Sequence, residues 1–176
     1  MRKPLVDPRH PRHVTVRMRR GVWNLRSQRC FGPISEALRK LRHREGFRVV
    51  HFSVQGNHLH LVTEADDRAA MSNGMRALLI RVARKLNRLM GTRGRLYADR
   101  FHERALTSSR AVFNVVRYVL ENHSKHVQQA GKLAPPVSDP FASSNRTLDD
   151  REHGPPWSAP ESWLLRVGWR RVAASS

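Results

Sequence analysis

Apolar and polar side chains alternate along three segments of the chain with the period of two that marks a half-buried β-strand. Residues 13–20 read HVTVRMRR, which places Val14 and Val16 on one face of a strand and Arg17 and Arg19 on the other. Two more strands are predicted, over residues 47–54 and 57–64. Because a Gly-Asn turn separates these two strands, we expect them to form a hairpin.

Longer segments carry apolar residues at the spacing of an amphipathic α-helix. The predicted helices span residues 35–44, 67–90 and 110–129, with Ser35, Asp66 or Asp67, and Ser108 or Ser109 as their N-caps. Residues 95–106 predict either a fourth strand or an irregular loop that leads into one. A last short helix, rich in Trp and Arg, is expected over residues 163–172 and would dock on the rest of the domain.

The order of these elements predicts the fold class. A β-α-β-β-α-β-α order is typical of a ferredoxin-like α+β domain, in which helices cover one face of an antiparallel sheet and leave the other face for a ligand. We divide the chain into a basic N-terminal arm (1–12), this domain (13–130), and a C-terminal tail (131–176). The tail is a Pro- and Ser-rich linker followed by a short basic segment that contains Trp.

Charge narrows the class of partner. The chain of 176 residues has 33 Lys and Arg against 14 Asp and Glu, a formal net charge of +19. Such an excess is tolerated mainly in proteins that bind a polyanion, and nucleic acid is the leading candidate. A membrane surface ranks second, but no apolar run approaches the ~20 residues of a transmembrane helix. The N-terminus lacks the apolar core of a signal peptide, so we expect a cytoplasmic, nucleoid-associated protein.

Candidate chemistry begins with two histidines in the predicted strand 57–64. Side chains at positions i and i+2 of a strand leave the same face, so the imidazoles of His58 and His60 should point the same way, as two ligands of a metal ion would. The alternative is a pair of half-buried histidines whose ring nitrogens bond to backbone carbonyls. The single cysteine, Cys30, excludes an intrachain disulfide and a thiolate zinc cluster.

A tyrosine and an asparagine in the predicted helix 110–129 complete the candidate site. Tyr118 and Asn122 are four residues apart and share one side of that helix, beside its apolar stripe. If the helix packs near the histidine strand, Asn122 adds an oxygen ligand and Tyr118 lies one turn away. Nitrogen and oxygen ligands without sulfur suit Mg²⁺ or Mn²⁺, with Zn²⁺ as an alternative. The competing interpretation of Tyr118 is an amphipathic anchor with a packed ring and a solvated hydroxyl.

Three short motifs resemble those of a known family. The runs NHLHL (57–61), GRLYADRF (94–101) and YVLEN (118–122) resemble, in order and spacing, the motifs of single-tyrosine HUH transposases, and most closely those of the REP-associated tyrosine transposases. The similarity extends over about residues 13–127. It departs from the family pattern after the tyrosine, where the family usually continues with Asn-Pro and a basic residue and this chain has Asn122-His123-Ser124-Lys125.

The resemblance implies the HUH fold and a defined chemistry. Tyr118 would attack a phosphodiester of single-stranded DNA, giving a 5′-phosphotyrosine linkage and a free 3′-hydroxyl. His58, His60 and Asn122 would hold the divalent metal, Mg²⁺ or Mn²⁺. The implied target is a hairpin of the REP type with a flanking single-stranded guide sequence. In such transposases the tyrosine helix serves its own subunit or a partner, so both a monomer and a homodimer stay open.

Binding of single-stranded DNA needs a cationic surface and exposed rings. The candidate DNA-binding residues are Arg17, Arg19, Arg81, Arg84, Arg88 and Arg100. Two other functions would also explain this cationic surface. A non-catalytic nucleic-acid-binding protein on the same fold would have the same charge, but Tyr118 and the histidines would be dispensable. A metal-independent RNA endonuclease of the CRISPR-processing type would need a glycine-rich loop near the C-terminus, which the sequence lacks.

Overall fold

The computed structural model describes residues 6–129, 139–145, 148 and 152–174, with the backbone alone over 122–129. In chain order the elements are β1 (Arg12–Arg17), α1 (Gln28–Leu41), β2 (Phe47–Val54), β3 (His58–Ala65), α2 (Arg68–Met90), β4 (His102–Ala105), α3 (Ser109–Gln129), a π-helical turn (Leu164–Gly168) and α4 (Trp169–Ala174). The four strands form one antiparallel sheet in the order β2-β3-β1-β4. This arrangement confirms the predicted α+β class and antiparallel sheet.

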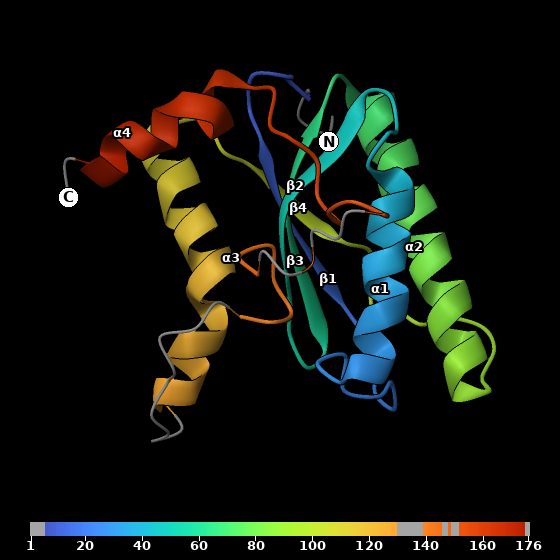
Figure 1. The fold of residues 1–176 in the computed structure, drawn as a ribbon. Coiled ribbons are helices and arrows are strands. Elements are labelled where there is room, and N and C mark those ends of the chain that lie inside the picture. The colour runs from blue at the N-terminus through green and yellow to red at the C-terminus, as the bar shows by residue number, and fades with distance from the viewer. Residues whose placement is uncertain (1–5, 130–138, 146–147, 149–151, 175–176) are drawn as a thin grey trace.

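Two helices cover one face of the sheet, as the sequence predicted. The stripe of α2 places Met75, Leu78 and Val82 in the same core as Leu59 and Leu61 of β3. Helix α1 packs beside α2 in this layer (Figure 1). The odd-numbered residues of β3 therefore face a closed apolar core.

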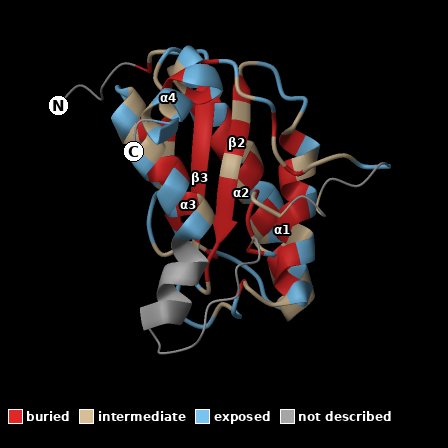
Figure 2. Ribbon diagram, turned by 60° about the vertical axis from the view of Figure 1, so that its left-hand side comes forward, coloured by how far each residue is buried: buried red, intermediate tan, exposed pale blue. Residues whose placement is uncertain are grey.

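Helix α3 lies against the other face, which the sequence analysis left open for a ligand. Val112, Val116 and Val119 are fully buried and form a second core with Val62 of β3 and Val50 of β2. The views of Figures 1 and 2 agree in placing α3 and α1–α2 on opposite sides of the strands. This face is covered because α3 also carries an apolar stripe, and that stripe needs an apolar surface to bury.

The predicted start of the first helix is wrong. Helix α1 begins at Gln28 and not after Ser35, because the side chain of Ser27 accepts a hydrogen bond from the backbone N–H of Cys30 (3.3 Å) and caps the helix there. Pro33 lies inside this helix and does not end it. Gly32 and Pro33, a pair that is typical of loops, are therefore part of the second helical turn.

The other boundaries differ less. Strand β2 has the predicted bounds, β3 begins one residue late, and Asp67 is the N-cap of α2. Strand β1 ends at Arg17, three residues early, and Met18 makes only an isolated bridge with Tyr97. The fourth strand is the short β4 within 95–106. Among the described residues, no helix has the length and apolar character needed to cross a bilayer.

The described parts of the C-terminal tail pack on the domain. Residues 139–145 add backbone hydrogen bonds along β2, from Val54 N–H to the carbonyl of Phe141 (2.9 Å) and from Ser143 N–H to that of Phe52 (3.0 Å). The helical segment expected over 163–172 is present, and its Leu165 is buried in the second core, against α3. Residues 130–138 of the predicted linker lie outside the described part of the chain.

Candidate active site

The structure brings His58, His60 and Tyr118 together on the α3 face of the sheet. In β3 the two histidines alternate with the buried Leu59 and Leu61 and share their face with Val62, on which α3 rests. The two imidazole rings are nearly parallel, with 6.0 Å between their centroids. His60 is 8% exposed and His58 is half-buried, so the pair lies at the margin between the second core and solvent.

Tyr118 reaches this margin because it lies beside the apolar stripe of α3, as the sequence indicated. Its ring meets the His60 ring edge-on, with 5.3 Å between the centroids. The side chain is 37% exposed, so it is accessible from solvent as well as from the histidines. Val119, the next residue, is fully buried and fixes the helix on the sheet. Strand β3, helix α3 and the hydrophobic core between them therefore hold the histidines and the tyrosine in place.

Asn122, the expected oxygen ligand, lies one helical turn after Tyr118 in α3, and its side chain is outside the described part of the structure. Within the described residues, no three His, Cys, Asp or Glu side chains converge as a metal site would require. A three-residue ligand set with His58 and His60 therefore depends on Asn122, and that assignment stays a prediction.

The chemistry of the two imidazoles fits a metal ion. Burial, and after it the positive charge of Arg17, lower the pKa of His58. Both causes disfavour the imidazolium form, so a neutral ring with a free lone pair is available to a cation near neutral pH. Arg17 is the direct neighbour of His58 across the β1–β3 pair, and their side chains share a face.

Two residues of β1 also contact the site, although sequence reasoning did not identify them. His13 Nε2 lies 3.3 Å and Thr15 Oγ1 lies 3.4 Å from Nδ1 of His60. Burial, and then the charge of Arg104, lower the pKa of His13. Both residues occupy the outer-facing positions of the alternating segment 13–20, which was the available signal. Their contact with His60 depends on the register between β1 and β3, which the sequence does not reveal.

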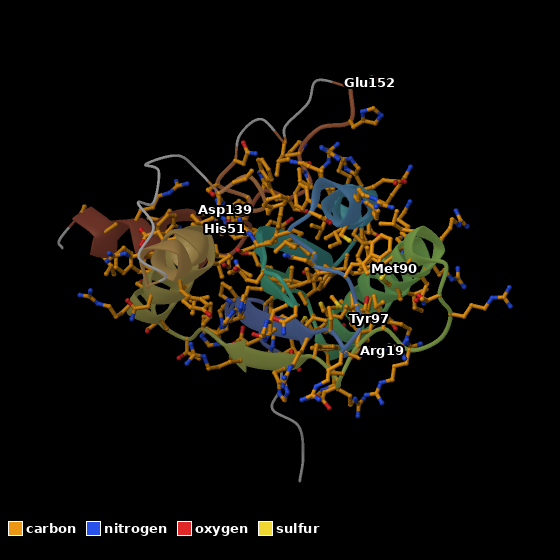
Figure 3. The ribbon with its side chains drawn as sticks, turned by 90° about the horizontal axis from the view of Figure 1, so that it is seen from below. Arg19, His51, Met90, Tyr97, Asp139 and Glu152 are labelled. Atoms are coloured by element: carbon orange, nitrogen blue, oxygen red, sulfur yellow. The ribbon has the colours of Figure 1, made fainter. Side chains whose placement is uncertain are left out.

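The predicted DNA-binding arginines fall into separate regions. Arg17 lies at the site, in register with His58. Arg19 follows β1, where its backbone N–H donates to the carbonyl of Leu96 (3.0 Å), and lies near Tyr97 at the α2 side of the molecule (Figure 3). Three arginines form an exposed row on α2: Arg81, Arg84 and Arg88. Because α2 packs on the other face of the sheet, this row lies across the sheet from Tyr118.

Arg100 lies in a groove beside the edge strand β4. The groove has a volume of about 550 Å³ and runs between β4 and the N-terminal half of α2. Its polar lining includes Arg68, Arg76, Arg100 and Ser72, together with Arg12 and Glu103, which pair with each other at 2.7 Å. Strand β4 is the sheet edge nearest to this groove, and its residues 102 and 104 are in register with Thr15 and His13 of the site face. A basic surface therefore continues from the site over the β4 edge.

Comparison with known proteins places this arrangement in a family. A family model described as IS200-like transposase matches residues 12–122, nearly two-thirds of the chain. The chain belongs to the IS200-like transposase family. The match begins at β1 and ends at Asn122, so it includes both histidines and the tyrosine. No functionally curated protein matches the chain.

Two solved structures are similar to this IS200-like chain, and the first of them shows the same fold. A REP-associated tyrosine transposase bound to a REP hairpin is 18% identical, with a TM-score of 0.59 over 92% of this chain and 91% of that one. A protein of Deinococcus radiodurans R1 that is assigned as a transposase is 15% identical, with a TM-score of 0.46 over 77% of this chain and 100% of that one. The first likeness extends beyond the domain into the C-terminal tail.

Proposed function

We propose that this IS200-like transposase cleaves and rejoins single-stranded DNA through a covalent bond to Tyr118. One observation carries the proposal: an accessible tyrosine from α3 lies edge-on to His60 of an H-x-H pair on β3. The chain has two tyrosines, and the other one, Tyr97, is engaged elsewhere. The Tyr97 hydroxyl donates a hydrogen bond to the carbonyl of Leu79 (2.6 Å), and burial raises its pKa.

The proposed step is a transesterification. Tyr118 Oη forms a bond to phosphorus while the bond from phosphorus to the 3′ oxygen breaks, which leaves a 5′-phosphotyrosine and a 3′-hydroxyl. The phenolic proton passes to solvent, and the departing 3′ oxygen takes up a proton. Because one phosphodiester replaces another, a second 3′-hydroxyl can reverse the step and join two strands.

His58, His60 and Asn122 would hold a divalent ion, Mg²⁺ or Mn²⁺. When bound, that ion would offset the negative charge that develops on the phosphate. Such help is needed because a tyrosine hydroxyl ionises only near pH ~10 and is a weak nucleophile at neutral pH. His58 and His60 place ring nitrogens on one face of β3, and Arg17 adds a positive charge beside His58.

The basic surface supports DNA as the substrate. Arg17 at the site and Arg100, Arg68 and Arg76 in the groove beside β4 would bind phosphates on either side of the scissile bond. We propose a REP-like hairpin with a single-stranded flank as the target, since the fold is shared with a transposase that binds a REP hairpin. By the same resemblance we place the chain in the REP-associated group.

Covalent capture tests this function. The full chain is incubated with labelled hairpin DNA that carries single-stranded flanks, with Mn²⁺, and then denatured. A DNA–protein adduct is expected for the wild type and for Tyr97→Phe, and no adduct for Tyr118→Phe or in the presence of EDTA. Salt-sensitive DNA binding without an adduct on any substrate would support the non-catalytic binding protein instead.

A further inference from the structure

His13 of β1 lies outside the three motifs, yet it touches both partners of the proposed chemistry. Its Nε2 lies 3.3 Å from Nδ1 of His60, and the two rings are stacked with 5.5 Å between centroids. Its ring also meets the Tyr118 ring edge-on at 6.1 Å. We infer that His13 is a positioning residue, which accepts a hydrogen bond from His60 and so directs the other nitrogen of His60 to the metal. This inference rests on the proposed function.

The inference follows from the two nitrogens of an imidazole. A neutral histidine carries one proton, so a ring that gives Nε2 to a metal must keep its proton on Nδ1 and donate it to an acceptor. Among the described residues, the atoms that contact Nδ1 of His60 include Nε2 of His13, at 3.3 Å, and Oγ1 of Thr15, at 3.4 Å. A hydrogen bond donated by Nδ1 of His60 to either atom would fix both the tautomer of His60 and the orientation of its ring.

The surroundings of His13 suit an acceptor. Nε2 can accept only when the ring is neutral with its proton on Nδ1. His13 is directly opposite Arg104 in the β1–β4 pair, and its Nε2 is the ring nitrogen that faces Nδ1 of His60. The ring also contacts both the His60 ring, at 5.5 Å, and the Tyr118 ring, at 6.1 Å, and these contacts favour its present orientation.

A direct ligand role for His13 does not fit the geometry. The His13 nitrogen near the site faces Nδ1 of His60, so it is occupied by that contact. Among the residues that the structure describes, His13, His58 and His60 do not converge as three ligands of one ion. His13 therefore acts through His60, and its loss should weaken metal binding without abolishing it.

Mn²⁺ binding to the full chain tests the inference without DNA. Electron paramagnetic resonance of free Mn²⁺ gives the dissociation constant for the wild type and for His13→Phe, His13→Gln and Thr15→Val. His13→Phe keeps a stacked ring and removes the acceptor, so affinity should fall about tenfold, as for other residues that support a metal-bound histidine. His13→Gln offers an amide oxygen and should recover most of that loss.

Thr15, the other described contact of Nδ1 of His60, provides a second test of the inference. Each single variant leaves one of these two contacts of Nδ1 of His60, whereas Thr15→Val combined with His13→Phe removes both of them. The double variant should therefore lose more affinity than the product of the two single losses. Thermal unfolding of each variant without metal shows whether the fold is intact.

The outcomes separate this inference from the function on which it rests. If the wild type binds Mn²⁺, His58→Ala abolishes binding, and folded His13→Phe binds as tightly as the wild type, the inference is overturned and the metal site stands. If the wild type does not bind Mn²⁺, both fail. Should His13→Phe not fold, nitrogen NMR of the Mg²⁺-loaded wild type decides, since a proton on Nε2 of His13 would overturn the inference and a proton on Nδ1 of His60 supports it.

Discussion

The Tyr118 ring faces the His60 imidazole edge-on, with 5.3 Å between the ring centroids. The contact joins a helix to a strand far away in the sequence, and it exists because Val116 and Val119 of α3 pack on Val62, two residues after His60. The position of the proposed nucleophile is thus set by a hydrophobic contact. Features that hold α3 on the sheet should matter for activity even when they are distant from the site.

Glu64 is such a feature, because its carboxylate anchors the C-terminal segment that packs on α3. It is 1% exposed and accepts hydrogen bonds from the backbone N–H groups of Glu161 (2.8 Å) and Ser162 (2.9 Å) and from the side chain of Arg48. Glu64→Gln replaces one accepting oxygen by a donor that faces another donor. We expect a loss of about 2 kcal/mol in the free energy of unfolding, measured in urea.

Glu161→Gln is the matched control for this prediction. The Glu161 carboxylate also pairs with Arg48, at 3.0 Å, but its side chain is 65% exposed. Solvent screens such a pair, so the expected loss is within about 0.5 kcal/mol. Equal effects of the two substitutions would show that Glu64 is not an anchor.

Stability should fall as the pH is lowered through the histidine range. Burial lowers the pKa of both His13 and His58 in the folded chain, so between the folded and unfolded pKa values the unfolded chain binds more protons. The free energy of unfolding therefore decreases as the pH falls below about 6.5, the ordinary histidine value. Melting temperatures between pH 7.5 and 5 measure this loss.

The variant that checks the cause is His13→Gln. It removes one of the two shifted groups, so its melting temperature should depend less steeply on pH than that of the wild type. His43→Gln, which removes an exposed ring just after α1, is the control for the loss of a histidine that lies away from the site. A steep dependence that survives in His13→Gln would place its origin elsewhere in the chain.

The groove beside β4 predicts a contribution to DNA binding that is separate from cleavage. Arg76→Ala removes an exposed cation that lines this groove, so it should weaken binding of hairpin DNA and reduce the salt slope by about one counterion. Arg44→Ala removes the same charge from an exposed position after α1, outside the groove. Fluorescence anisotropy at several salt concentrations distinguishes the two, and identical slopes would contradict a specific role of the groove.

Local patterns predicted the local features of the structure. Alternation in 57–64 placed His58 and His60 on one face, and the stripe of 110–129 placed Tyr118 beside the buried side of α3. Both follow from the fixed geometry of a strand and a helix. The start of α1 was missed because Ser27 and Ser35 both fit an N-cap, and Pro33 indicated a break that the helix tolerates.

Long-range relationships could not be predicted from one sequence. The contact of His13 with His60 depends on the pairing of β1 with β3, and strand register is set by the packing of the whole sheet. The choice of sheet face by α3 is of the same kind, because its stripe would fit either apolar surface. The convergence of Asn122 with the histidines remains a prediction.

The proposed role of Tyr118 is tested most directly by identifying the residue to which the DNA becomes attached. After covalent capture, the adduct is digested with nuclease and trypsin, and tandem mass spectrometry locates the nucleotide phosphate. We expect the phosphate on Tyr118, in the peptide YVLENHSK that follows Arg117. A phosphate on Tyr97, in the peptide LYADR, or on any residue other than tyrosine, would contradict the proposed role.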